Sequence, residues 1–169
     1  MNKILLTGRI GIGKSTIVKS VLKSIDLKIG GYTEEKILNG SIEIIKIKSI
    51  GYKSKEGIIA VRDIKNGKVT GYIDVFDTIG TEILDESLRY SELIVMDEIG
   101  FLEEKAELFR NKIIEVLDSN KSVIGVIKDF DKKSELLDMI RKRKDVSIIT
   151  VDENNRNNLT DKVVHDLKL

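Results

Sequence analysis

The chain has 169 residues, which is enough for one domain spanning residues 1–169 and too short for two ordinary domains. Its 29 Lys and Arg residues nearly balance 28 Asp and Glu residues, and the formal charge of +1 argues against nucleic acid and anionic membranes as partners. The sequence contains no Cys and a single His, which excludes disulfides and Cys/His zinc sites and leaves a Ser-His-Asp hydrolase dependent on His165 alone.

The chain begins with the pattern of a strand, a loop and a helix. Residues 3–7 form a short apolar run that ends in a Gly-rich turn, and residues 14–25 carry apolar side chains at helical spacing. The first run is far shorter than a secretory apolar segment, and no stretch approaches the roughly 18 apolar residues that span a bilayer. We therefore expect a cytoplasmic protein without a membrane segment.

The pattern changes over residues 29–76. Short β-branched stretches separated by Gly occupy residues 42–50, 57–62 and 69–76. The Asn66-Gly67 pair between the last two stretches is a strong signal for a hairpin turn. These features predict an antiparallel β insertion between the first helix and the rest of the fold.

Helical and strand patterns alternate from residue 77 onward. The expected elements are a helix at 78–90, a strand at 93–96, a helix at 104–118, a strand at 122–127, a helix at 132–142, a strand at 146–151 and a helix from about 157. The run at 93–96 is continuously apolar, as a strand buried on both faces requires. The alternation predicts a three-layer α/β fold, with a mostly parallel central sheet and helices on both faces.

A phosphate-binding loop joins the first strand to the first helix. Every specified position of the pattern G-x-x-x-x-G-K-S/T is matched by the run Gly8, Arg9, Ile10, Gly11, Ile12, Gly13, Lys14 and Ser15. Bare glycine backbone lets N–H groups surround a triphosphate, and the following helix adds its positive dipole end. As a catalytic residue, Lys14 would supply a positive charge to the β- and γ-phosphates. Ser15 would bind Mg²⁺, and Thr16 would contact the α-phosphate. The predicted fold is therefore that of the P-loop NTPases.

An acidic pair follows the apolar strand. Asp97 and Glu98 come directly after residues 93–96, at the strand end where ligands bind in open α/β sheets. Asp97 would hold Mg²⁺ through a water, because Mg²⁺ keeps part of its hydration shell. Glu98 would orient or deprotonate the water that attacks the γ-phosphate. A helix N-cap at Asp97 is the structural alternative.

Basic residues outside the loop have weaker assignments. Arg156 follows the last expected strand and could stack on a nucleotide base, although a polar loop before the last helix explains it equally well. The run at 141–144 could form a lid that closes on phosphate or a nucleic-acid patch, but it is more typical of a solvated helix end. Sequence patterns do not single out a catalytic arginine among Arg62, Arg89, Arg110, Arg141, Arg143 and Arg156.

With both motifs placed, the sequence resembles the THEP1-type nucleoside triphosphatases, which include the cancer-related nucleoside-triphosphatase. The likeness rests on the phosphate loop, on Asp97-Glu98-Ile99-Gly100, and on three further runs. These runs are Gly30-Gly31-Tyr32-Thr33, Gly71-Tyr72-Ile73-Asp74-Val75-Phe76 and Asn155-Arg156. The resemblance implies slow hydrolysis of several nucleoside triphosphates, ATP and GTP among them, and a sheet like that of RecA and the nucleotide kinases.

Three functions remain open from sequence. The first is Mg²⁺-dependent hydrolysis of ATP, GTP, CTP and UTP to the diphosphate and phosphate. The second is a nucleotide or nucleoside kinase, because the same loop and metal serve transfer to an acceptor hydroxyl. The third is a nucleotide-gated regulatory module. The preferred base and the oligomeric state are not encoded in any pattern that we recognise.

Overall fold

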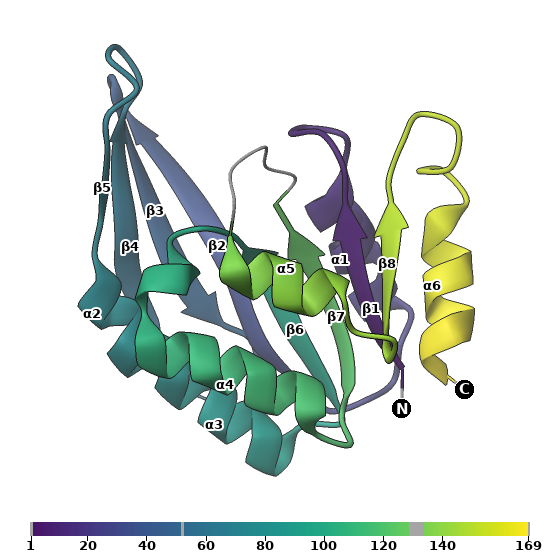
Figure 1. The fold of residues 1–169 in the computed structure, drawn as a ribbon. Coiled ribbons are helices and arrows are strands. Elements are labelled where there is room, and N and C mark those ends of the chain that lie inside the picture. Colours follow the sequence, from purple (N-terminus) through teal and green to yellow (C-terminus); the bar gives the residue numbers. More distant parts are fainter. Residues whose placement is uncertain (1, 52, 129–133, 169) are drawn as a thin grey trace.

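The computed structural model describes residues 2–51, 53–128 and 134–168. These residues form one eight-stranded sheet in the order β5-β4-β3-β2-β6-β7-β1-β8 (Figure 1). The strands are β1 (Lys3–Thr7), β2 (Ile29–Asn39), β3 (Ile42–Ser49), β4 (Glu56–Asp63), β5 (Val69–Gly71), β6 (Leu93–Ile99), β7 (Ser122–Ile127) and β8 (Val146–Thr150). The principal helices are α1 (Lys14–Lys23), α3 (Thr81–Tyr90), α4 (Glu107–Asp118), α5 (Glu135–Arg141) and α6 (Leu159–Lys168).

The sheet has a parallel half and an antiparallel half that share β2. Strands β2, β6, β7, β1 and β8 pair in parallel, whereas β2 to β5 form consecutive antiparallel pairs. Residues 29–33 of β2 lie beside β6, and residues 32–39 lie beside β3. The predicted antiparallel region is confirmed, and its first strand is an integral part of the parallel sheet. Its hairpins project beyond the carboxyl ends of the parallel strands (Figure 1).

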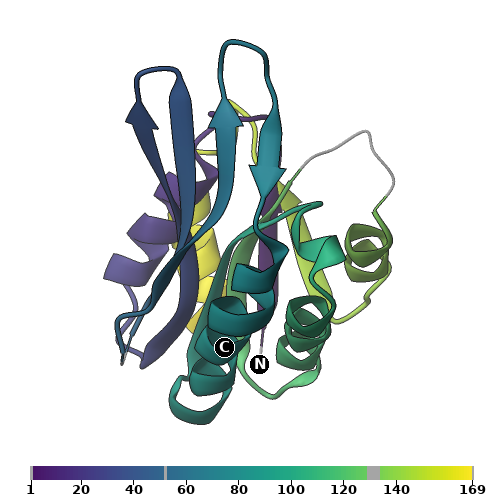
Figure 2. The same cartoon turned by 90° about the vertical axis from the view of Figure 1, so that its left-hand side faces the viewer.

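Helices cover both faces of the sheet, as predicted. Figure 2 shows α1 and α6 on one side of the strands and α3, α4 and α5 on the other. Each face has its own apolar core. The first includes Val18 and Val21 of α1 with Val163 of α6, and the second includes Leu84 of α3 with Phe109 of α4. The buried strands between these cores are apolar on both faces, which explains their continuous hydrophobic runs.

The expected strand at 69–76 is wrong in its second half. Strand β5 ends at Gly71, and the chain then forms the short helix α2 (Ile73–Val75) and a helical turn over Phe76–Gly80 that leads into α3. Phe76 is fully buried, with its ring centroid 5.2 Å from that of Phe109. Burial of this ring against α4 overrides the strand preference of the neighbouring β-branched residues.

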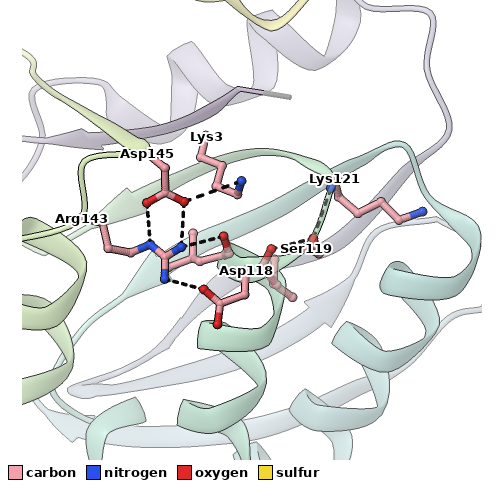
Figure 3. A network of polar contacts seen from close by, with 8 residues as sticks. Lys3, Asp118, Ser119, Lys121, Arg143 and Asp145 are labelled. Atoms are coloured by element: carbon pink, nitrogen blue, oxygen red, sulfur yellow. Dashed lines mark hydrogen bonds and ion pairs between the residues drawn. The ribbon is translucent and has the colours of Figure 1, made fainter.

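A network of ion pairs joins three segments at the amino edge of the sheet, opposite the phosphate loop. Arg143 donates to both carboxylate oxygens of Asp145, at 3.0 and 2.7 Å, and to Asp118 at 2.7 Å. Lys3 lies 3.9 Å from Asp145. Figure 3 shows how the network connects the loop before β8 with the end of α4 and the start of β1. Arg143 is therefore held in place, unlike the solvated charge expected from sequence.

Candidate active site

The phosphate loop has the backbone that its motif predicts. Gly8, Gly11 and Gly13 have φ angles of 130°, 80° and 110°, in the left-handed region that favours glycine. At Gly8 a Cβ would also lie only 2.5 Å from the carbonyl oxygen of Val151. Lys14 Nζ donates to the carbonyl oxygens of Gly8 at 2.6 Å and Arg9 at 2.9 Å. The lysine ammonium thus lies over the loop at the start of α1.

The acidic pair lies at the carboxyl end of β6 and contacts the phosphate loop directly. Ser15 Oγ donates to Asp97 Oδ1 at 3.0 Å, although 82 positions separate the two residues. Asp97 is buried, with 4% of its surface exposed, and a cis peptide bond joins it to Glu98. Glu98 Oε1 lies 2.9 Å from Lys128 Nζ. The strand continues to Ile99, so a helix N-cap at Asp97 is wrong.

The two motifs open onto one cavity of about 380 Å³. The predicted residues that line it are Gly8, Ile10, Gly11, Gly13, Lys14, Ser15, Thr16 and Glu98. Arg9 and Ile12 instead line a separate hollow beside the loop after β8, where Arg9 pairs with Glu153. Arg156 is exposed and lines neither cavity. The structure therefore brings the phosphate loop and Glu98 together and leaves Arg156 outside.

Four further residues line the cavity that sequence patterns had not assigned to it. They are Lys36 of β2, Arg62 of β4, Phe101 and Lys128. Arg62 alone among the six candidate arginines lines it in the described structure, and its guanidinium lies 3.2 Å from Glu43. Lys128 could have been found, because it follows the expected strand at 122–127 and so must lie at the ligand-binding edge. The positions of Lys36 and Arg62 depend on the hairpin register.

Asp97 and Glu103 are carboxyl groups near the candidate site that are shielded from water. Glu103 is 1% exposed, and its Oε2 accepts the N–H of Gly100 at 2.9 Å. Burial and the nearby Glu34 raise the pKa of Glu103 to about 8. Burial also raises the pKa of Glu34, against the opposing effect of Lys128. Burial raises the pKa of Asp97, whereas the hydrogen bond from Ser15 lowers this pKa. Loss of hydration on burial is therefore the main reason that the pKa values of these carboxyl groups are raised.

The donor set beside the phosphate loop fits magnesium. The Ser15 hydroxyl and the Asp97 carboxylate, 3.0 Å apart, are hard oxygen groups that could serve as ligands beside the phosphate loop. Within the described residues no group of three His, Cys, Asp or Glu side chains is arranged to hold a metal. One hydroxyl and one carboxylate would suit Mg²⁺, which commonly binds one or two protein oxygens together with water and substrate phosphates.

Comparisons with known proteins agree with this geometry. A family model described as NTPase matches residues 3–164. The chain belongs to this NTPase family. Nucleoside-triphosphatase THEP1 of Thermotoga maritima is 35% identical over 98% of this chain and 95% of its own length. The protein of the same name from Methanocaldococcus jannaschii is 30% identical over 79% of this chain and 85% of its own length. The resemblance and the predicted enzyme class are confirmed.

Solved structures show the same fold as this NTPase. The crystal structure of THEP1 from the hyperthermophile Aquifex aeolicus matches with a TM-score of 0.79 and 23% identity, over 100% of both chains. The solution structure of a human cancer-related nucleoside triphosphatase matches with a TM-score of 0.77 and 24% identity, over 98% of this chain and 96% of that chain. The predicted P-loop fold is confirmed. Among the described helices, none is both long and apolar enough to cross a bilayer.

Proposed function

We propose that this NTPase is a Mg²⁺-dependent hydrolase of nucleoside triphosphates, with ATP, GTP, CTP and UTP as candidate substrates and the diphosphate and phosphate as products. The observation that supports this most is the meeting of Lys14 and Glu98 in one cavity, with Ser15 bonded to Asp97 at its wall. Hydrolysis of a phosphoanhydride needs a cationic group that binds the phosphates and a carboxylate that acts as the base. We retain the cytoplasmic location as a prediction.

In this proposal the residues divide the chemistry between them. Lys14 and the loop amides hold the β- and γ-phosphates, and Lys14 offsets the charge that develops on them. Glu98 orients a water and takes its proton while the water oxygen forms a bond to the γ-phosphorus. The bond from that phosphorus to the β,γ-bridging oxygen breaks, and its electron pair leaves with the diphosphate. Mg²⁺, when bound through Ser15 and Asp97, would draw negative charge from the phosphate oxygens.

A kinase is the second candidate, and the cationic wall of the cavity is the observation that favours it. Lys36, Arg62 and Lys128 line the cavity in addition to Lys14. A phosphorylated acceptor could bind such a wall and receive the γ-phosphoryl group in place of water.

One assay separates the candidates. The purified protein is incubated with Mg²⁺ and each of the four triphosphates, with and without nucleosides and nucleoside monophosphates, while free phosphate and phosphorylated products are followed. Phosphate release without an acceptor supports hydrolysis. Transfer only to an acceptor supports the kinase, and tight binding without turnover supports a regulatory module.

Two variants test the roles of the named residues. Lys14→Ala is expected to weaken binding of every nucleotide by about 100-fold or more, because it removes a charge-assisted contact to phosphate. Glu98→Gln is expected to bind nucleotide at least as tightly as the parental protein and to lower kcat by about 10²- to 10⁴-fold. Two exposed residues provide matched controls. Lys142→Ala changes the residue that follows α5, and Glu107→Gln changes the first residue of α4. Hydrolysis by Glu98→Gln at the parental rate would rule out Glu98 as the base.

A further inference from the structure

Lys128 is the first residue after β7, the strand between the two strands of the candidate active site. Val126 of β7 has Leu6 of β1 as its register partner on one side and Asp97 of β6 on the other. The N–H of Lys128 donates to the carbonyl of Ile99 at 2.9 Å, which anchors its backbone. Lys128 therefore lies at the carboxyl edge of the sheet, between the strand that leads into the phosphate loop and the strand that carries the acidic pair.

The side chain of Lys128 is directed to the cavity by its surroundings. Its Nζ lies 2.9 Å from Glu98 Oε1, and the two side chains are only 22% and 17% exposed. Its stem passes over Gly100, where a Cβ would lie 2.7 Å from Lys128 Cδ. A lysine stem has four rotatable bonds, so the ammonium can change its partner while the backbone stays in place.

Two of the ammonium groups in the cavity, those of Lys14 and Lys128, contact acceptors that a polyphosphate can replace. Lys14 Nζ donates to two carbonyl oxygens of the phosphate loop, and Lys128 Nζ pairs with Glu98. A γ-phosphate carries more negative charge than a carboxylate and offers three oxygens, so it competes effectively for an ammonium. A carboxylate that pairs with an ammonium is also a weaker acceptor for the proton of water. Moving Lys128 to the phosphate would thus free Glu98.

We propose that Lys128 is a specificity-determining residue, which distinguishes nucleoside triphosphates from diphosphates by exchanging Glu98 for the γ-phosphate. The inference rests on the proposed function, because that function places the γ-phosphate next to Glu98. A triphosphate gains a contact that a diphosphate cannot make. Glu98 becomes free to accept a proton from water only when the γ-phosphate is present.

The ratio of two dissociation constants tests this exchange. Calorimetry with Mg²⁺ measures the Kd of ADP and of a non-hydrolysable ATP analogue for the parental protein and its variants. Lys128→Met is expected to raise the Kd of the analogue by about 10- to 100-fold and to change the Kd of ADP by less than about 2-fold. Lys128→Arg retains the charge and should keep the parental ratio within about 3-fold. Lys142→Met is the control for loss of a lysine elsewhere.

A double-variant cycle tests the exchange itself. Glu98→Gln removes the ion pair that Lys128 must break, so the analogue should bind about 3- to 10-fold more tightly, and this gain should shrink in the Lys128→Met background. If Lys128→Met does not fold, Lys128→Gln completes the cycle. Equal losses for ADP and the analogue, or an equal Glu98→Gln gain in both backgrounds, would overturn the proposal. Failure of the parental protein to bind either nucleotide would instead overturn the proposed function.

Discussion

The buried carboxyl of Glu103 should make the stability of this protein fall as pH rises through neutrality. Its pKa is raised from 4.5 to about 8 by burial and by Glu34. Below pH 4.5 the group is protonated in both the folded and the unfolded chain, so it has no effect. Between 4.5 and about 8 the unfolded chain releases the proton and the folded protein keeps it. The folded state then binds more protons, and the free energy of unfolding decreases with pH.

The size of this effect follows from the same shift. A rise from 4.5 to about 8 is roughly three and a half pKa units, which at about 1.36 kcal/mol per unit sets an upper bound of about 5 kcal/mol. Relaxation and water entry around a newly charged group reduce this cost, so we expect about 1 to 3 kcal/mol. Glu34 lies close enough to share the titration, and the measured midpoint therefore belongs to the pair.

Glu103→Gln is the substitution that isolates the charge. A glutamine keeps an oxygen that can accept the N–H of Gly100 and never ionises. At pH 8.5 the variant should be more stable than the parental protein by about 1 to 3 kcal/mol, and at pH 5 this advantage should disappear. Urea denaturation followed by circular dichroism measures this, because the chain lacks Trp. Glu107→Gln on the exposed face of α4 is the control.

Two results would refute this reasoning about Glu103. One is that the free energy of unfolding of the parental protein, relative to that of Glu103→Gln, stays constant or increases between pH 6 and 8. The other is a variant that is less stable than the parental protein by the same amount at every pH, which would mean that the carboxyl contributes through its hydrogen bond and not through its proton.

Two further substitutions test the core and the ion network. Phe109→Ala removes a fully buried ring and should lower the free energy of unfolding by about 3 to 5 kcal/mol, whereas Leu108→Ala, at a side chain that is 58% exposed, should change it by less than about 0.5 kcal/mol; equal losses in urea denaturation would contradict the assigned burial. Arg143→Ala breaks the network of Figure 3 and should cost about 1 kcal/mol at low salt and less at high salt, because its acidic partners are largely exposed. The exposed Arg89→Ala is its control, and a loss that does not respond to salt would argue against an electrostatic role.

Local features of the sequence were sufficient to predict most of the sheet and its helices. The strand predicted at 122–127 has the bounds that the structure shows, because an apolar run between two polar turns defines a strand without help from distant residues. The segment after Gly71 could not be predicted in the same way. Its helical path depends on where Phe76 is buried, and that position is set by α4, which comes later in the chain.

The candidate site likewise contains residues that local sequence predicts and residues that tertiary contacts place. The phosphate loop and the acidic pair could be predicted from local sequence, because each is a contiguous run whose backbone and neighbours carry the chemistry. Lys128 could be expected at this edge from its place after the strand at 122–127, but tertiary contacts were needed to show that Lys36 and Arg62 line the same cavity. Their positions follow from the pairing order of the strands and the register of a hairpin, and both result from contacts between residues far apart in the chain.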